Sequence, residues 1–297
     1  MASGRQEALF SRGTAPAQRG FTLVEAIMVI VITGVLSGVV AVFVKGPVEG
    51  YVSGVRRAEL GDIADTALRR MARDLRTAVP NSLRLSSDGK YIEFIPMSAG
   101  GRYRAEGSGN AYCATGDDHL DFSAIDTCFE ILGPAMTFSA GDRIFVGSTQ
   151  SDGNLPYQGE TSSAHIRRPY AGATGSPVNF VTMTSSARLP ASAELSGSRF
   201  QVAAQSTQAV SYGCESIAAA PSGGDGPGSL RRYWAYGYNP TQATPPVGGS
   251  KALLADKLSA CSMQYEARDA LFSVTLQLTR AGESVRLYHE IHVNTTP

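Results

Sequence analysis

The feature that most constrains this chain is a long apolar run close to its start. Residues 20–25 read Gly-Phe-Thr-Leu-Val-Glu, and the 24 residues from Phe21 to Val44 contain one charged side chain, that of Glu25. A membrane-spanning helix needs about 20 predominantly apolar residues, so this run is long enough to cross a bilayer. A carboxylate at that depth is costly unless something pairs with it. The sequence therefore predicts a single membrane-spanning helix whose one acid has a function.

The residues before this run form a basic leader. A secretory signal is cut after its apolar region, whereas here the only sequence typical of processing, Arg19-Gly20-Phe21, lies before it. An uncleaved signal anchor with an incidental glutamate is the alternative interpretation. Basic flanks stay cytoplasmic, so we expect the rest of the chain in the periplasm. The leader has a net charge of +2, from Arg5, Arg12, Arg19 and Glu7. The rest of the chain has a net charge of −2.

This arrangement resembles the class III signal of the type IV pilin family. In that family a basic leader ends in Gly and is followed by Phe-Thr-Leu-(Ile/Val)-Glu and a long apolar helix. The resemblance implies that a prepilin peptidase/methyltransferase cuts between Gly20 and Phe21 and methylates the new amino terminus on Phe21. It also implies that Glu25, fifth in the mature chain, serves filament assembly by pairing with the methylated amine of a neighbouring subunit. The other partners implied are major and minor pilins and the inner-membrane assembly platform.

A second helical pattern follows the apolar run. Pro47 lies further from the cleavage site than the usual first helix proline of the family, and a proline there predicts a kink or break. Over residues 60–78 apolar side chains recur at helical spacing, and Asp65 and Arg69 stand at a favourable spacing of four on the other side. A helix over residues 21–79 would span roughly 90 Å. The expected apolar stripe comprises Leu60, Ile63, Ala64, Ala67, Leu68, Met71, Leu75 and Ala78.

Residues 80–297 are expected to form one β-rich head, about 220 residues long and able to bury a sizeable core. Alternating apolar residues predict a hairpin of Phe272–Leu278 and Val285–Val293, whose apolar face suits the amphipathic helix. Weaker alternating patterns predict six further strands, and stretches rich in turn-forming residues predict three loops. The other expected strands are Lys90–Ile95, Arg143–Val146, Val178–Met183, Phe200–Ala203, Ala209–Tyr212 and Leu230–Tyr236, and the expected loops are 147–176, 218–229 and 239–250.

Resemblance to the pilin family gives these parts one architecture. In that family the first half of the helix leaves the membrane to pack in the filament core, and the second half docks onto a sheet. The expected fold is therefore α+β, the type IV pilin fold, with a long N-terminal helix packed on an antiparallel β-sheet head. The expected divisions are the cleaved leader (1–20), the membrane and filament-core helix (21–44), the amphipathic periplasmic helix (45–79) and the head (80–297).

Four cysteines in an exported chain suggest two disulfides and an oxidising compartment. Four cysteines allow three connectivities, and pairing in sequence order is the simplest. It joins Cys113 to Cys128 and Cys214 to Cys261. A zinc site is the alternative, and it is disfavoured because no Cys-x-x-Cys or Cys/His spacing of the usual kind occurs.

An acidic loop inside the first cysteine pair is the strongest remaining metal signal. Calcium prefers several oxygen ligands, but the spacing does not match an EF-hand, and a solvated loop is the simpler interpretation. His289 and His292 are three apart, so on a strand they point to opposite faces and do not share a ligand. We therefore expect no metal and no cofactor. The acidic loop contains Asp117, Asp118, Asp121 and Asp126.

Two other features have open interpretations. Gly34 and Gly38 form a small-xxx-small pair, which favours close helix approach or local flexibility of the helix. Trp234 lies among tyrosines and arginines, which form either a binding surface or ordinary strand packing. No common catalytic or nucleotide-binding motif occurs, so we expect no enzyme activity. Basic residues are not clustered, so we expect no nucleic-acid partner. The residues around the tryptophan are Arg231, Arg232, Tyr233, Tyr236 and Tyr238.

Two further stretches resemble one group of minor pilins. Residues 50–76 contain Gly-Tyr, Arg-Arg-Ala-Glu-Leu and Ala-Leu-Arg-Arg-Met-Ala-Arg-Asp-Leu-Arg, and residues 288–297 read Tyr-His-Glu-Ile-His-Val-Asn-Thr-Thr-Pro. They resemble the MshO-type minor pilins of mannose-sensitive haemagglutinin (MSHA) pilus systems. The resemblance implies a minor pilin that initiates or caps a type IV pilus, first in the bacterial inner membrane and then at the cell surface. The alternatives are a minor pseudopilin of a type II secretion system and an adhesin or DNA-binding tip module on a pilin carrier.

Overall fold

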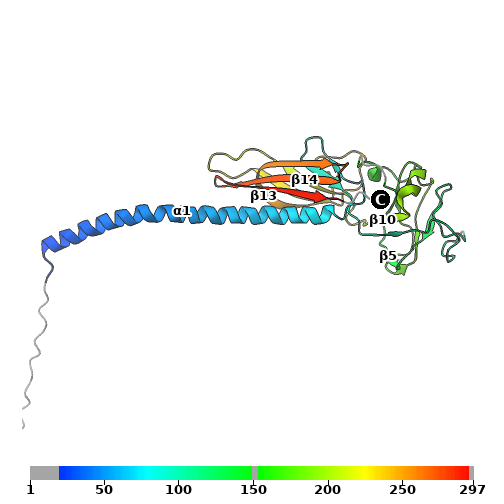
Figure 1. The fold of residues 1–297 in the computed structure, drawn as a ribbon, viewed down its shortest axis with the longest axis horizontal. Coiled ribbons are helices and arrows are strands. Elements are labelled where there is room, and N and C mark those ends of the chain that lie inside the picture. Colours follow the sequence, from blue (N-terminus) through cyan, green and yellow to red (C-terminus); the bar gives the residue numbers. More distant parts are fainter. Residues whose placement is uncertain (1–19, 115, 149–152, 294–297) are drawn as a thin grey trace, which may run out of the picture. The chain divides into compact units, whose positions relative to one another are not determined.

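The computed structural model describes residues 20–114, 116–148 and 153–293 (Figure 1). The expected basic leader up to Arg19 and the last four residues lie outside this part of the chain. The chain forms two compact units, Met1–Gly54 and Val55–Pro297. The second unit contains the last part of the long helix and all of the β-structure.

One long helix precedes all the strands. The helical elements are α1 (Leu23–Leu75) and the short 3-10 helices η1 (Leu155–Tyr157) and η2 (Ala191–Ser196). The strands are β1 (Arg84–Leu85), β2 (Tyr91–Phe94), β3 (Ala99–Arg102), β4 (Cys128–Glu130), β5 (Met136–Thr137), β6 (Arg143–Val146), β7 (Arg167–Pro169), β8 (Pro177–Val178), β9 (Phe180–Thr182), β10 (Arg199–Ala203), β11 (Val210–Glu215), β12 (Gly228–Trp234), β13 (Ser250–Glu266), β14 (Leu271–Arg280) and β15 (Glu283–His292).

Helix α1 continues through Pro47, so this proline does not break it. The helix ends at Leu75, four residues before the expected Val79. The reason is that the following residues pair with the end of β2. The Val79 N–H donates to the Ile95 carbonyl at 2.7 Å, and Ala78 forms an isolated β-bridge with Pro96. The backbone groups that would extend the helix are thus used in β-type pairing.

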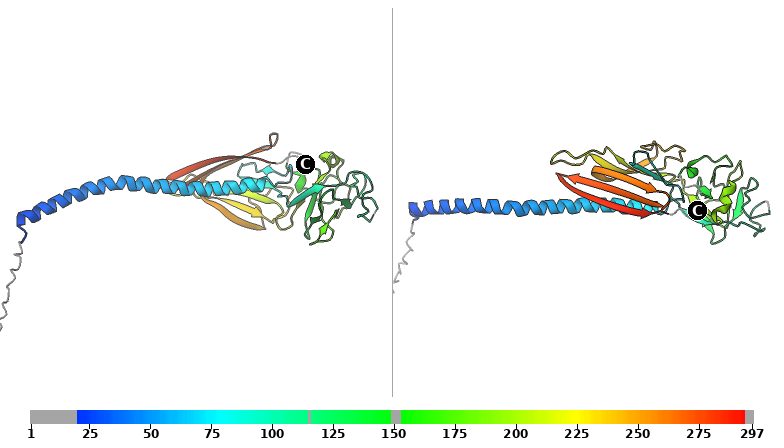
Figure 2. Two further views of the ribbon diagram at one scale, coloured as in Figure 1. Left: turned by 60° about the horizontal axis from the view of Figure 1, so that its bottom comes forward. Right: turned by 45° about the horizontal axis from the view of Figure 1, so that its top comes forward.

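A seven-stranded antiparallel sheet forms the main part of the head, with the strand order β1-β2-β11-β12-β13-β14-β15. The predicted C-terminal hairpin is confirmed as β14 and β15, in which Phe272 pairs with Ile291 and Leu276 with Leu287. These side chains point to one face of the sheet, as the alternation predicts. The predicted strands near β2, β11 and β12 are confirmed as well. In both views of Figure 2 these strands lie along the C-terminal part of α1.

The 17-residue strand β13 was not predicted. Its pairing with β12 and β14 shifts register on both sides of Leu258. Lys257, one residue earlier, has a φ of 60°, in the left-handed region. The buried apolar side chains therefore fall at Ala255, Leu258 and Met263, which do not share one period of two. Because a bulge switches the buried face along a strand, the alternation that identifies a strand is lost.

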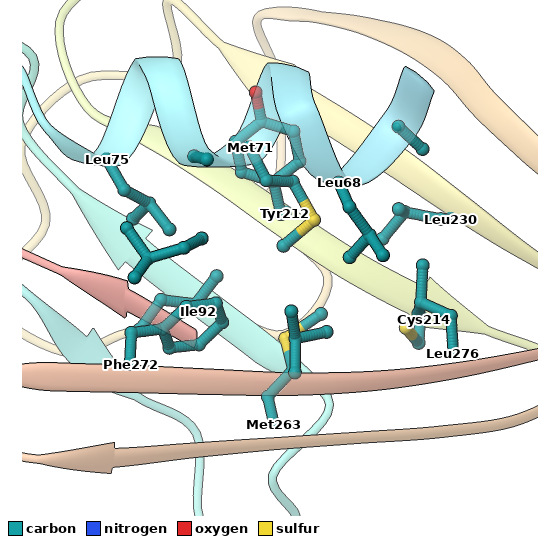
Figure 3. Packing of buried hydrophobic residues seen from close by; sticks show 14 of the residues in the cluster. Leu68, Met71, Leu75, Ile92, Tyr212, Cys214, Leu230, Met263, Phe272 and Leu276 are labelled. Carbon is teal, nitrogen blue, oxygen red and sulfur yellow. The ribbon is translucent and has the colours of Figure 1, made fainter. Parts of the chain in front are cut away.

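The main core lies between α1 and this sheet. Figure 3 shows Leu68, Met71 and Leu75 pointing from α1 toward side chains of the sheet. Both Met71 and Leu75 are fully buried. Truncating a buried leucine to alanine costs about 2–5 kcal/mol, so this stripe fixes the helix on the sheet. The residues of the predicted stripe that are buried are Leu60, Ala64, Ala67, Leu68, Met71, Leu75 and Ala78, and Ile63 is half-buried.

A second lobe is inserted between β2 and β11, which are direct neighbours in the main sheet. It contains a four-stranded sheet, β3-β10-β6-β7, and the two-stranded sheets β4-β9 and β5-β8. Its own core includes Phe129, Phe138 and Phe200. The described residues of the head thus contain three clusters of buried apolar side chains: one between α1 and the main sheet, one in this lobe, and a smaller one that includes Phe145 and Tyr157. The predicted strand at 178–183 divides into β8 and β9, and β7 lies in a stretch predicted to be a loop.

A buried ion pair ties the second lobe to the main sheet. The side chain of Arg84 on β1 is 6% exposed and its Nε donates to Glu93 Oε2 on β2 at 2.6 Å. The guanidinium also lies 3.7 Å from the ring centre of Tyr157 in the second lobe. It donates to the Asn239 carbonyl at 2.6 Å, and the Tyr236 hydroxyl donates to Glu93 Oε1 at 2.9 Å. Burial raises the pKa of Glu93, and the Arg84 guanidinium opposes that shift.

Candidate functional site: the N-terminal processing and assembly segment

Thr22 caps the start of α1. Its hydroxyl oxygen accepts a hydrogen bond from the Glu25 N–H at 3.3 Å, and its carbonyl accepts the first helical bond from Ala26 at 3.1 Å. A threonine followed three residues later by glutamate is the sequence pattern of a capping box. This signal was present in the sequence and was overlooked there. The cap places the helix start two residues after the Gly20–Phe21 bond.

Glu25 lies in the first turn of α1. The unpaired N–H groups at a helix start favour a negative charge there. The residue is exposed, and within the described residues it forms no ion pair.

Packing in the described structure does not require a glycine at position 20. A Cβ built on Gly20 would meet no atom within 4 Å, and its φ does not fall in the left-handed region. The same is true of Gly34 and Gly38, whose surroundings are open within the described structure. The described structure thus gives no packing or backbone reason for glycine at these three positions.

The first half of α1 leaves its apolar side chains uncovered. Phe21 is 80% exposed, and no residue between Phe21 and Val55 is buried. By length and composition α1 is able to cross a membrane. An apolar surface of this extent needs a cover of lipid or of other apolar helices. The segment thus suits an apolar environment.

The acidic loop uses its carboxylates to organise its own backbone. Asp118 is fully buried and accepts hydrogen bonds from the N–H groups of Cys113 at 2.7 Å and Tyr112 at 3.1 Å. Burial alone would raise the pKa of Asp118, but these backbone donors outweigh burial and the pKa lies below its ordinary value. Asp126 likewise accepts from the N–H of Asp121 at 2.8 Å. Within the described residues no group of three His, Cys, Asp or Glu side chains is arranged to hold a metal ion.

The structure joins Cys113 to Cys128 and Cys214 to Cys261 as disulfides. These are the pairs predicted from sequence order. The Cα atoms are 5.7 Å apart in the first pair and 6.4 Å apart in the second. Cys214 lies in the main core, whereas the first disulfide closes the acidic loop of the second lobe.

The residues around Trp234 serve packing within the head. Arg232 lies 5.1 Å from the centre of the Trp234 ring and donates to Asp74 on α1 at 2.9 Å. Tyr233 donates to Glu215 on the neighbouring strand. These contacts favour the second of the two interpretations. On β15, His289 is half-buried and His292 is exposed, as expected for residues on opposite faces of a strand.

Residues 16–41 match the model of the prokaryotic N-terminal methylation motif. Comparisons with curated proteins and with solved structures gave no match. The motif and the helix-on-sheet architecture together define an α+β, type IV pilin-like fold with a class III prepilin signal. Such a signal implies processing by a prepilin peptidase and assembly with other pilins, and it supports a pilin or pseudopilin subunit. With the apolar helix, it fits a single-pass inner-membrane protein with a C-terminal head.

Proposed function

We propose that this chain is a minor pilin that helps to initiate or cap a type IV pilus of the MSHA kind. The observation that carries the proposal is the match at residues 16–41, which continues into a helix whose first half is apolar and exposed. Such a helix suits transfer from a membrane into a filament core, because both environments cover apolar surface. The role is structural, and no catalytic step is assigned to the chain.

The proposed maturation begins with cleavage between Gly20 and Phe21. The open space around Gly20 supports this, because no contact within the described fold restricts which residue a peptidase can select there. Methylation of the new amino group on Phe21 would follow. Thr22 would then stand second in the mature chain, so the amine would lie directly beside the helix cap.

Glu25 is proposed to pair with the methylated amine of a neighbouring subunit during assembly. The carboxylate has no ion-pair partner within the described residues, and the apolar helix around it excludes water once it is packed. An ion pair in such surroundings is strongly coupled, and removal of one member leaves the other charge uncompensated.

The proposal of a minor rather than a major subunit draws on the size of the head. Its second lobe adds a separate sheet and core to the sheet that packs on α1. The head is proposed to face the periplasm before assembly and the cell surface afterwards. Protein composition of sheared pili tests this role: we expect the chain at a small fraction of the main subunit, and dominance of the stained gel by this chain would contradict it.

A minor pseudopilin of a type II secretion system remains the alternative, because it would carry the same signal and helix. Deletion of the gene separates the two functions. A minor pilin predicts loss of surface pili with normal secretion of exoenzymes. Loss of exoenzyme secretion with normal piliation would overturn the pilus assignment and favour the pseudopilin.

A further inference from the structure

The second lobe contains a groove of about 340 Å³ next to the point where the chain leaves the helix region. The residues that line it are Gly100, Gly101 and Arg102 of β3, Arg199, Phe200 and Gln201 of β10, and Pro80 and Met97. Gly100 and Gly101 of β3 have no side chains that would fill the groove. A Cβ on Gly100 would lie 3.2 Å from the Phe200 carbonyl and 3.3 Å from Met97 Sδ, inside the groove's own lining.

Two arginines stand at one end of this groove. Arg102 on β3 and Arg199 on β10 are direct register partners in the antiparallel pair, and both are exposed. Within the described residues neither forms an ion pair, although nine other arginine–carboxylate contacts are present. Like charges directly opposite each other on a sheet are destabilising. An anion between the two guanidinium groups would offset this repulsion.

A buried amide oxygen also lines the groove. Gln201 is 5% exposed, and its Oε1 atom has no hydrogen-bond partner in the described structure. It lies on β10 two residues after Arg199, so both side chains belong to the same face of the strand. A buried acceptor without a donor costs about 1–3 kcal/mol. A ligand hydroxyl in the groove would supply the missing donor.

We propose that this groove is a binding site for an acidic saccharide unit, with a carboxylate held by Arg102 and Arg199 and a ring hydroxyl donated to Gln201 Oε1. Guanidinium groups match the two oxygens of a carboxylate, which gives this end its charge preference. Met97 and Pro80 offer apolar atoms to the C–H face of a sugar ring. The volume is at the lower end for ligand sites, so one ring or the end of a chain fits. This site goes beyond assembly and does not depend on whether the filament is a pilus or a pseudopilus.

The test uses the full-length chain in detergent micelles and two probes that differ only at C6, methyl glucuronide with a carboxylate and methyl glucoside with a hydroxymethyl group. We expect the glucuronide to bind at least tenfold more tightly by calorimetry or ligand-observed NMR. Inorganic sulfate serves as a third probe, and binding as tight as that of the glucuronide would overturn the saccharide assignment. Equal binding of the two sugars would overturn the role of the arginines.

Variants distinguish this site from general charge effects. The double variant Arg102→Ala/Arg199→Ala should weaken glucuronide binding at least tenfold. The double variant Arg268→Ala/Arg286→Ala removes the same charge from two exposed arginines of the main sheet region and should leave binding unchanged. An equal loss in both double variants would contradict the proposal.

Gln201→Leu separates binding from folding. Because Oε1 lacks a partner in the free protein, the change to leucine should not lower the unfolding midpoint, yet it should weaken glucuronide binding at least threefold. Unchanged binding in this variant would contradict the assigned hydrogen bond. A lowered midpoint with unchanged binding would show that Gln201 serves the fold alone.

Discussion

The carboxylate of Asp74, in the last turn of α1, lies 2.9 Å from the Nε atom of Arg232 on β12. The same oxygen, Asp74 Oδ2, accepts a hydrogen bond from the Tyr212 hydroxyl at 2.7 Å. The side chains of Arg232 and Asp74 are 13% and 22% exposed. Those of the Arg69–Asp65 pair on the outer side of the helix are 74% and 48% exposed. The first pair joins helix to sheet in a poorly hydrated place, whereas solvent screens the second.

Asp74→Ala should lower the free energy of unfolding of the head by about 2–3 kcal/mol, because two donors are left without their charged acceptor. Asp65→Ala is the matched control on the same helix and should cost less than about 0.5 kcal/mol. Chemical denaturation of the full-length chain in detergent measures both. Equal costs for the two variants would mean that burial does not strengthen the Asp74 interactions.

The two disulfides should contribute unequally to stability. Cys214 and Cys261 are 47 residues apart in sequence, and Cys113 and Cys128 are 15 apart. Loop closure in the unfolded chain predicts about 4 kcal/mol for the first and about 3 kcal/mol for the second. We expect the Cys214→Ala/Cys261→Ala variant to unfold at lower denaturant concentration than Cys113→Ala/Cys128→Ala. The reverse order would show that native contacts in the acidic loop outweigh chain entropy.

Asp118 should make the acidic loop sensitive to acid. Its pKa in the folded chain lies below the ordinary 3.8, so its stabilising effect is fully present above that value and is lost as the pH falls through the folded pKa. Asp118→Asn should open the loop at neutral pH, because the amide replaces one acceptor oxygen with a donor. Amide hydrogen exchange of residues 110–113 reports this opening.

The matched control for Asp118 is Asp117→Asn. Asp117 is exposed and bonds to His119 Nδ1 at 2.6 Å, so its change should leave exchange in the loop unaltered. Wild-type exchange rates that do not rise on acidification below about pH 4, after correction for the intrinsic rate, would contradict the role of Asp118.

Gly20→Leu should block removal of the leader, because the peptidase must fit a small residue before Phe21. Gly34→Leu places the same side chain at a position that is equally open in this chain and should leave cleavage unchanged. Immunoblots of membrane fractions distinguish the precursor from the mature form by size. Mature-sized protein from Gly20→Leu would contradict the proposed cleavage site.

Glu25→Ala should be cleaved and exported normally but should be depleted from filaments at least tenfold, because a neighbouring amine would be buried without a counter-charge. Glu49→Ala removes another acid of α1, one whose contact with Lys45 is exposed and 3.8 Å long, and should assemble normally. Comparison of sheared fibres with the membrane fraction measures both variants. Undiminished incorporation of Glu25→Ala would mean that this acid has no role in assembly.

Much of the helix and of the C-terminal hairpin could be predicted from the sequence, because their periodicity is regular. Residues such as Leu60, Met71 and Leu75 recur at helical spacing, and Phe272 and Leu276 alternate with polar neighbours. Strand β13 escaped prediction because bulges on both sides of Leu258 change which side chains face the core. The end of α1 was predicted too late in the sequence because the Val79 N–H donates to the Ile95 carbonyl. No local sequence pattern around Val79 indicates that hydrogen bond.

The N-terminal site could be predicted from the sequence because its signal is contiguous, from Gly20 to Glu25. The cap formed by Thr22 could also have been read there, since its pattern is local. The groove in the second lobe could not. Arg102 and Arg199 are almost a hundred positions apart, and only the pairing of β3 with β10 brings them together. Likewise, no local pattern marks Asp74 as the acid that faces Tyr212 rather than solvent.

The second lobe leaves the main sheet after β2 and returns at β11, and Phe94 and Val210 face each other across those two strands. Departure and return are therefore separated by one interstrand spacing, about 4.8 Å. In topological terms the whole lobe is an oversized hairpin loop. A short turn could replace it without altering the strand order, and a lobe of different sequence could be grafted at the same two points. Two neighbouring strands of the main sheet thus carry both chain connections to the whole lobe.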